Sequence, residues 1–214
     1  MFERPQYLDS DRKPLLLHIP ADAHSILDVG CNRGGFGRAI KATREAEVWG
    51  VEPDAASADA ARDCLDQVIT DIFDKRNPIP EGYFDLVTFN DSLEHMIDPG
   101  GALELAKTKL RAGGRVQCCV PNIRYIDNLE HLLCERDWRY EEQGIRDRTH
   151  LRFFTEKSIV RLFECTGYRV IRTIGINECW WERDKLLRRL LFRLFPALTR
   201  DMRYMQTLVI AEPL

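Results

Sequence analysis

A glycine-rich break directly after a short apolar segment constrains this chain more than any other feature. Residues 26–30 read Ile-Leu-Asp-Val-Gly, and the chain continues as Cys-Asn-Arg-Gly-Gly-Phe-Gly to residue 37. This pattern is typical of a buried parallel strand that turns sharply into a helix, because glycine lets the backbone approach a ligand closely. A second apolar run, 48–51, ends in Glu52, about twenty residues further on, where a carboxylate can accept both hydroxyl protons of a ribose. Together the two segments predict a site for an adenosine-type cofactor.

Candidate strands and helices alternate along almost the whole chain, which is typical of a sheet built from β-α-β units. We expect seven strands, near 26–30, 47–52, 67–71, 84–89, 114–120, 168–176 and 204–212. We expect helices near 8–18, 35–44, 55–64, 99–111 and 155–167. Pro99 and Gly100 are expected to begin one of these helices, and the loop pair Gly113 and Gly114 to end it.

Length and composition predict one globular domain, because 214 residues with 44% hydrophobic content can form a single substantial core. A net charge of −3 and a sequence pI of about 6.0 argue against nucleic acid as a partner. The N-terminus does not read as a signal peptide, and no apolar stretch approaches the ~18 residues of a spanning helix. Seven cysteines without a C-x-x-C pair favour reduced thiols and a cytoplasmic location.

The residue pattern around the glycines indicates which cofactor to expect. A dinucleotide site needs G-x-G-x-x-G so that a pyrophosphate can bind at the helix N-terminus. Here Asp28 stands just before the glycines, and a carboxylate repels phosphate but suits a cationic ligand. A dinucleotide-dependent oxidoreductase is therefore the less favoured alternative.

The segment from Asp28 to Gly34 resembles the D-x-G-x-G-x-G motif of class I S-adenosylmethionine (SAM) methyltransferases, with Asn32 in place of the middle glycine. The resemblance extends from about residue 17 to 210. It implies SAM as cofactor and an α/β fold with a Rossmann-like seven-stranded sheet, its last strand antiparallel and helices on both faces. The whole chain, 1–214, is then one domain. Two insertions relative to the minimal fold, 122–150 and 180–203, are candidates for a substrate lid.

The resemblance also implies which residues bind the cofactor. The glycine bend holds the methionine end of SAM, Glu52 the ribose, and the third and fourth strand ends the adenine and sulfonium. The implied residues are Asp28, Gly30, Cys31, Asn32, Gly34, Glu52, Pro53, Asp71, Ile72 and Asn90. Asp71 has a simpler alternative as a helix N-cap. Cys31 is expected to pack the loop rather than react, and Cys118 and Cys119 to be small core residues.

Two segments carry the candidate catalytic groups: Asp91 to Pro99, which includes Glu94 and His95, and Asp147 to Thr155, which includes His150. They resemble segments of small-RNA terminal 2′-O-methyltransferases and ubiquinone-pathway O-methyltransferases that bind a divalent metal. That resemblance implies Asp91, Glu94, His95 and His150 as both catalytic and metal-binding residues. Mixed imidazole and carboxylate ligands favour Mn²⁺, Fe²⁺ or Zn²⁺ over Mg²⁺. The alternatives are a histidine that removes the hydroxyl proton directly, and purely positional roles.

The stretch from Asp147 to Thr155 resembles more closely the type 11/23-like SAM methyltransferases of bacterial surface-polysaccharide and glycan pathways, as does Val120 to Tyr125. Part of the motif is helix punctuation, with Thr155 as an N-cap and Gly167 as a C-cap. The expected activity is O-methylation of a sugar or another small hydroxylated acceptor. Alternatives are a quinone-pathway phenol, a nitrogen acceptor, or a non-catalytic SAM-fold accessory protein.

The candidate lid contains aromatic and cationic residues with two interpretations. They either line the acceptor site, where rings and guanidinium groups suit sugars and diphosphates, or form a core anchor and a solvated, ion-paired face. The residues concerned are Trp138, Arg139, Tyr140, Arg146, Arg148 and Arg152, with Glu135, Asp137 and Glu141 as candidate ion-pair partners.

Residues 180–196 predict an amphipathic helix with Leu187, Leu190, Leu191 and Leu194 on one side and basic residues toward the other. We expect the leucines to pack on the sheet or in a dimer interface. A peripheral contact of 181–196 with an anionic membrane is the alternative.

Overall fold

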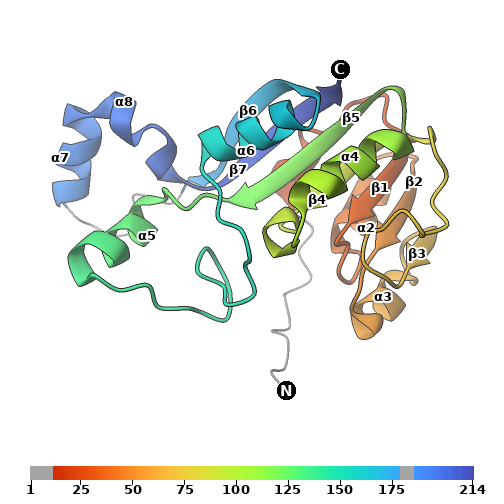
Figure 1. Ribbon diagram of the computed structural model, residues 1–214, viewed down its shortest axis with the longest axis horizontal. Helices are drawn as coiled ribbons and strands as arrows, with labels where there is room; N and C mark the ends of the chain where they lie inside the picture. Colours follow the sequence, from red (N-terminus) through yellow and green to blue (C-terminus); the bar gives the residue numbers. More distant parts are fainter. Residues whose placement is uncertain (1–11, 179–185) are drawn as a thin grey trace.

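Seven strands form one mixed sheet, shown in the computed structural model of Figure 1, which describes residues 12–178 and 186–214. The strand order is β3-β2-β1-β4-β5-β7-β6. Strands β1 to β5 pair in parallel, and β7 lies antiparallel between β5 and β6. The bounds are β1 Ser25–Val29, β2 Glu47–Val51, β3 Gln67–Ile69, β4 Phe84–Asn90, β5 Leu110–Pro121, β6 Tyr168–Glu178 and β7 Tyr204–Pro213. This is the sheet expected from the sequence, with its last strand antiparallel.

Helices cover both faces of the sheet, as expected. One face packs against α4 and α6 through residues such as Leu103 and Phe163, and the other against α1, α2 and α3 through Leu15 and Ile40. The helices are α1 Lys13–Leu16, α2 Gly35–Thr43, α3 Ala55–Ala61, α4 Pro99–Lys109, α5 Ile126–Glu130, α6 Glu156–Cys165, α7 Leu186–Leu194 and α8 Pro196–Thr199. Short 3-10 turns span Leu93–His95 and Asp201–Arg203, and a π turn spans His131–Glu135. Cys118 and Cys119 are core residues, as predicted.

Two expected helix ends are wrong. The helix expected over 8–18 is helical only over Lys13–Leu16, and its residues 8–11 lie outside the described chain. Gly113 and Gly114 do not close α4, because β5 already begins at Leu110, which pairs with Phe84. The register then shifts between Phe84 and Leu86, and Gly113 at φ 79° fits the irregular stretch.

The described parts of the two insertions meet at one end of the molecule, beyond the end of the sheet toward which β5 points (Figure 1). Tyr125 and Ile126, next to and within α5, form a small core with Phe192 of α7 and Met202. The expectation that the α7 leucines pack on the sheet is wrong, since Leu187, Leu190 and Leu194 are exposed and Leu191 packs against this small core. Arg188 is buried instead. No helix among the described residues has the length and apolarity to cross a bilayer.

Helix α6 begins with the N-cap that the sequence predicts. The Thr155 hydroxyl accepts a hydrogen bond from the Ser158 backbone N–H at 3.1 Å, and the Ser158 hydroxyl accepts one from the Thr155 N–H at 2.8 Å. Gly167, at φ 75°, follows the C-cap Thr166. These contacts satisfy backbone groups that the helix itself cannot pair.

We therefore expect Thr155→Ala to lower the free energy of unfolding by about 1 kcal/mol, because the first turn of α6 loses its cap. Urea unfolding followed by circular dichroism measures the change. Thr108→Ala, at an exposed position near the end of α4, is the control and should leave stability unchanged or slightly raised. Equal effects of the two substitutions would contradict the capping role.

Candidate active site

The glycine bend between β1 and α2 brings the backbone against the segment after β4. Gly30, Asn32 and Gly34 all have positive φ, at 81°, 48° and 77°. A Cβ atom on Gly30 would lie 2.7 Å from Cβ of Ser92, so no larger residue fits there without moving that segment. The bend therefore leaves backbone N–H groups at the carboxyl edge of the sheet, where open α/β sheets bind ligands.

Glu52 ties this bend to the end of β2. One carboxylate oxygen accepts a hydrogen bond from the Asn32 N–H and the other from the Asp54 N–H, both at 2.9 Å. A carboxylate in this position is of the kind that accepts hydrogen bonds from ribose hydroxyls. The structure thus brings together the two motifs on which the cofactor prediction rests.

Asp28, at the end of β1, is a buried carboxyl group with a perturbed pKa. It is 2% exposed and accepts a hydrogen bond from the Thr88 hydroxyl at 2.6 Å. Burial raises the pKa of Asp28 to about 6, against the opposing effects of the Thr88 hydrogen bond and the nearby Arg12 guanidinium. A cationic ligand next to Asp28 would favour its ionised form.

Arg12 is a site residue that the sequence analysis missed. Its guanidinium forms a salt bridge with Asp91, whose other carboxylate oxygen accepts a hydrogen bond from Gln206 Nε2 at 2.5 Å. Asp91 itself has φ 52°, an uncommon conformation for a residue other than glycine. No local sequence motif indicates that Arg12 or Gln206 belongs to the site. Both residues are far from Asp91 in the sequence and contact it only in the folded chain.

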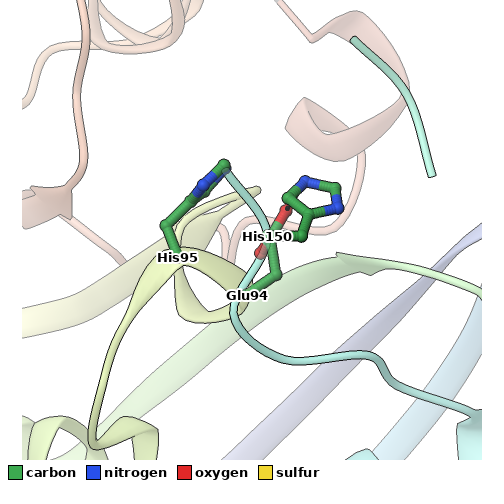
Figure 2. Close-up of side chains that lie close together, drawn as sticks. All are labelled: Glu94, His95 and His150. Carbon is green, nitrogen blue, oxygen red and sulfur yellow. Dashed lines mark ion pairs between the residues drawn. The ribbon is translucent and has the colours of Figure 1, made fainter. Parts of the chain in front are cut away.

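Glu94, His95 and His150 converge at the carboxyl edge, as Figure 2 shows. Their candidate ligand atoms lie within 4.8 Å of one another, and His150 Nε2 is 3.9 Å from Glu94 Oε1. Leu151 and Arg152 hold the His150 segment in place, since their backbone N–H groups donate to the Glu94 carbonyl at 2.8 and 2.9 Å. The structure thus assembles three of the four expected residues.

The prediction that Asp91 is a metal ligand is wrong, because Asp91 does not belong to that cluster. Its carboxylate is engaged by Arg12 and Gln206, so it is removed from the candidate metal ligands.

Both imidazoles are oriented through Nδ1. His150 Nδ1 lies 3.1 Å from the Ile145 carbonyl oxygen, and His95 Nδ1 lies 3.2 Å from the Thr149 carbonyl oxygen. A carbonyl only accepts, and the Thr149 hydroxyl, 3.1 Å from His95 Nδ1, donates to Asp147, so these contacts favour a proton on Nδ1 and a lone pair on Nε2 in each neutral ring. Burial and the neighbouring His150 lower the pKa of His95, which favours its neutral form.

Glu94 is the most unusual group at this edge. It is 1% exposed, and neither carboxylate oxygen has a hydrogen-bond partner among the described residues. Burial, together with the negative charge of Asp91, raises the pKa of Glu94 well above its ordinary value. The side-chain polar atoms of Asn90 and Ser92 are also buried without partners in the described chain. Such a concentration of unsatisfied buried groups is more common at functional sites than in an ordinary core.

The remaining expected cofactor residues are placed as follows. Cys31 is buried, and burial raises the pKa of its thiol, so it packs the loop as expected. Asp71 and Ile72 are exposed and follow β3. The helix N-cap alternative for Asp71 is wrong, because no helix follows it. Pro53 is exposed after Glu52.

The candidate lid places two aromatic rings near the histidines. Its arginines Arg146 and Arg148 form ion pairs with glutamates of the same segment. Trp138 packs edge-on against Phe153 with ring centroids 5.2 Å apart, and Phe153 is 6.4 Å from His150. Arg146 pairs with Glu141, and Arg148 with Glu142. Of the expected ion pairs, the structure contains the one between Arg146 and Glu141, but Arg146 is buried rather than solvated, and the partner of Arg148 is Glu142, which was not expected. The ring pair is the part of this segment that lies toward the histidines.

Residues 3–173 match the family model of a methyltransferase domain. This match covers well over half of the chain, and the chain belongs to the methyltransferase domain family. Its fold is that of a SAM-dependent methyltransferase from Archaeoglobus fulgidus, with a TM-score of 0.70 at 19% identity over 93% of this chain and 91% of that one.

Among relatives, the chain is 28% identical to the ubiquinone biosynthesis O-methyltransferase of Aeromonas salmonicida over 165 residues, or 71% of this chain and 66% of that protein. The enzyme of the same name from Acinetobacter baylyi is 32% identical over 98 residues, or 42% of this chain and 41% of that protein. The matches span 38% to 66% of the lengths of the curated relatives.

The raised pKa of Asp28 predicts a specific pH dependence of stability. A folded-state pKa of about 6, above the ordinary value near 3.9, gives stability that is present below about pH 4 and lost as the pH rises through about 6. Asp28→Asn cannot ionise. We expect the stability of the wild type relative to Asp28→Asn to fall by about 3 kcal/mol between about pH 4 and pH 8, measured by urea unfolding without cofactor. A difference that stays constant with pH would contradict this assignment.

Proposed function

We propose that the protein transfers the methyl group of SAM to a hydroxyl oxygen of a small acceptor, and that a phenolic ring hydroxyl is the favoured acceptor. The observation that carries the proposal is the buried, unpartnered Glu94 carboxyl group beside two oriented imidazoles at the edge where the glycine bend lies. Similarity to two ubiquinone biosynthesis O-methyltransferases supports oxygen as the acceptor atom.

The charges around the bend suit SAM, which carries a sulfonium, an ammonium and a carboxylate. The buried Asp28 carboxyl group at the bend attracts its cationic groups. Glu52 accepts hydrogen bonds from the ribose hydroxyls. Each of these roles uses a charge that the structure holds at the carboxyl edge before the ligand arrives.

Methyl transfer to oxygen needs a place for the hydroxyl proton. SAM supplies an activated methyl carbon, whose bond to sulfur breaks as its bond to the acceptor oxygen forms. In a phenol the hydroxyl pKa is near 10, so a neutral imidazole can remove the proton as this bond forms. His95 and His150 are the candidates, because their Nδ1 contacts leave Nε2 as the proton-accepting nitrogen.

A divalent cation fits the same three residues. Glu94, His95 and His150 offer one oxygen and two nitrogens, a donor set suited to Mn²⁺, Fe²⁺ or Zn²⁺. The backbone carbonyls on Nδ1 are the outer contacts that orient metal-binding histidines, and a cation would compensate the buried Glu94 charge. When bound, such a cation stabilises a developing alkoxide or phenolate.

The lid favours a phenol over a sugar linked to a diphosphate. Arg146 and Arg148, which suited a diphosphate in the sequence analysis, are neutralised by Glu141 and Glu142. The edge-on pair of Trp138 and Phe153 offers apolar surface to a planar ring instead. Similarity to the ubiquinone biosynthesis enzymes points the same way.

A tritiated-methyl assay with phenols, catechols, nucleotide sugars and lipid-linked oligosaccharides tests the acceptor class. We expect transfer to the phenol or catechol group and none to the sugars. Labelling of a sugar acceptor alone would replace the phenol with the glycan interpretation, and labelling of an amine alone would contradict O-methylation.

The Glu94→Gln substitution tests the role of the cluster formed by Glu94, His95 and His150. We expect kcat to fall at least about 100-fold, since the neutral amide cannot compensate a cation held with the two imidazoles. SAM binding should stay near wild type, because Glu94 lies outside the glycine bend, and the variant should be no less stable than wild type, because it lacks the buried, unpartnered carboxyl group. Assays after chelation and metal re-addition then separate the two mechanisms. Full turnover in enzyme stripped of metal would exclude the metal-dependent mechanism. Full activity of Glu94→Gln would show that Glu94 takes part in neither the metal-dependent nor the direct histidine mechanism.

A further inference from the structure

Helix α7 exposes the face that its sequence would normally bury. Leu186 is 82% exposed, Leu187 77%, Leu190 49% and Leu194 58%. At 100° per residue these four leucines share one side of the helix. The exposed side chains of Phe195 and Leu198 continue this apolar surface into α8. We call these six residues the leucine face.

The opposite side of α7 explains why the leucines point outward. Arg188 is 3% exposed and donates hydrogen bonds to Glu130 at 2.5 and 2.6 Å and to Asp127 at 3.1 Å. Phe192, one turn later, is buried in the small core with Tyr125. A buried arginine with two carboxylate partners is costly to rearrange, because breaking it leaves charges unpaired. The helix is therefore held with Leu186, Leu187, Leu190 and Leu194 away from the fold, while Leu191 packs against the small core.

Within residues 186–200 every charged side chain is basic. Residues 186–200 contain four arginines and no aspartate or glutamate. Arg188 is paired with α5, and Arg200 with Glu156. Arg189 and Arg193 are exposed and lie one turn apart along the flank of the leucines.

We propose that the leucine face docks on a membrane surface that contains anionic lipids, with α7 lying in the plane of the interface. Exposed leucines beside arginines are the combination that binds such surfaces, through apolar burial among the acyl chains and attraction to the headgroups. A two-fold dimer through this face would bring the basic flanks of both copies together, which is less favourable than contact with an anionic surface.

The leucine face belongs to the same lobe as the loop that carries His150 (Figure 1). Arg188 fixes α7 to α5, and Asn128 of α5 accepts a hydrogen bond from Arg146 at 3.3 Å, four residues before His150. Docking would therefore place this lobe at the lipid surface, where an acceptor with an apolar tail resides. The docking itself does not depend on which acceptor is methylated.

Vesicle sedimentation with the full chain tests the proposal. We expect the protein to bind phosphatidylcholine vesicles that contain phosphatidylglycerol, to bind pure phosphatidylcholine more weakly, and to dissociate as salt is raised. The double variant Leu187→Glu with Leu190→Glu should bind about tenfold more weakly or worse, because it removes apolar contact and adds repulsion. Arg189→Gln with Arg193→Gln should lose the preference for anionic lipid. Leu214→Glu, at an exposed terminal position, is the matched control and should bind as wild type.

Each other outcome has a definite meaning. Absence of wild-type binding, or equal binding by the double leucine variant, overturns the proposal. A dimer in solution that the leucine variant converts to monomer, without vesicle binding, assigns the face to a second copy instead. Calorimetry with SAM on every variant separates this test from the proposed methyl transfer, since none of the substituted residues lies near the glycine bend.

Discussion

The contact between Glu52 and the backbone of the glycine bend is the constraint on which the rest of the site depends. One carboxylate receives the Asn32 N–H from the bend after β1 and the Asp54 N–H from the turn after β2. Parallel pairing of these strands brings both turns to the same edge of the sheet. The register of the sheet thereby sets the distance between the methionine end and the ribose end of a bound cofactor.

The second constraint is the electrostatic cost of Glu94. A buried carboxyl group without a hydrogen bond is unfavourable in its charged form, and the fold retains it beside His95 and His150. Proteins keep such groups where a ligand or cation compensates them in the working state. The contacts that orient the two imidazoles come from the backbone of the 145–150 loop, so the orientation of both rings depends on how this loop is docked.

The sheet and the glycine bend could be predicted from the sequence, because the periodicity of apolar residues and the positions of the glycines are local signals. The Thr155 cap is a local signal of the same kind. The sequence did not predict the contacts of side chains whose partners are distant along the chain. Arg12 and Gln206 reach Asp91 only in the folded chain, which is why Asp91 was expected among metal ligands. Periodicity placed the α7 leucines inward, but Glu130 and Asp127 hold Arg188 there instead. Burial in α7 is thus decided by a charge contact that no local pattern reveals.

Isothermal titration calorimetry of SAM against the wild type and Glu52→Gln tests the central claim most directly. The account predicts that the wild type binds SAM and that Glu52→Gln binds it at least about tenfold more weakly, because a charge-assisted hydrogen bond contributes about 1.5–3 kcal/mol. Glu47→Gln, at the opposite end of β2, should bind as the wild type does. Absence of binding to the folded wild type, or equal affinity of Glu52→Gln and wild type, would contradict the account.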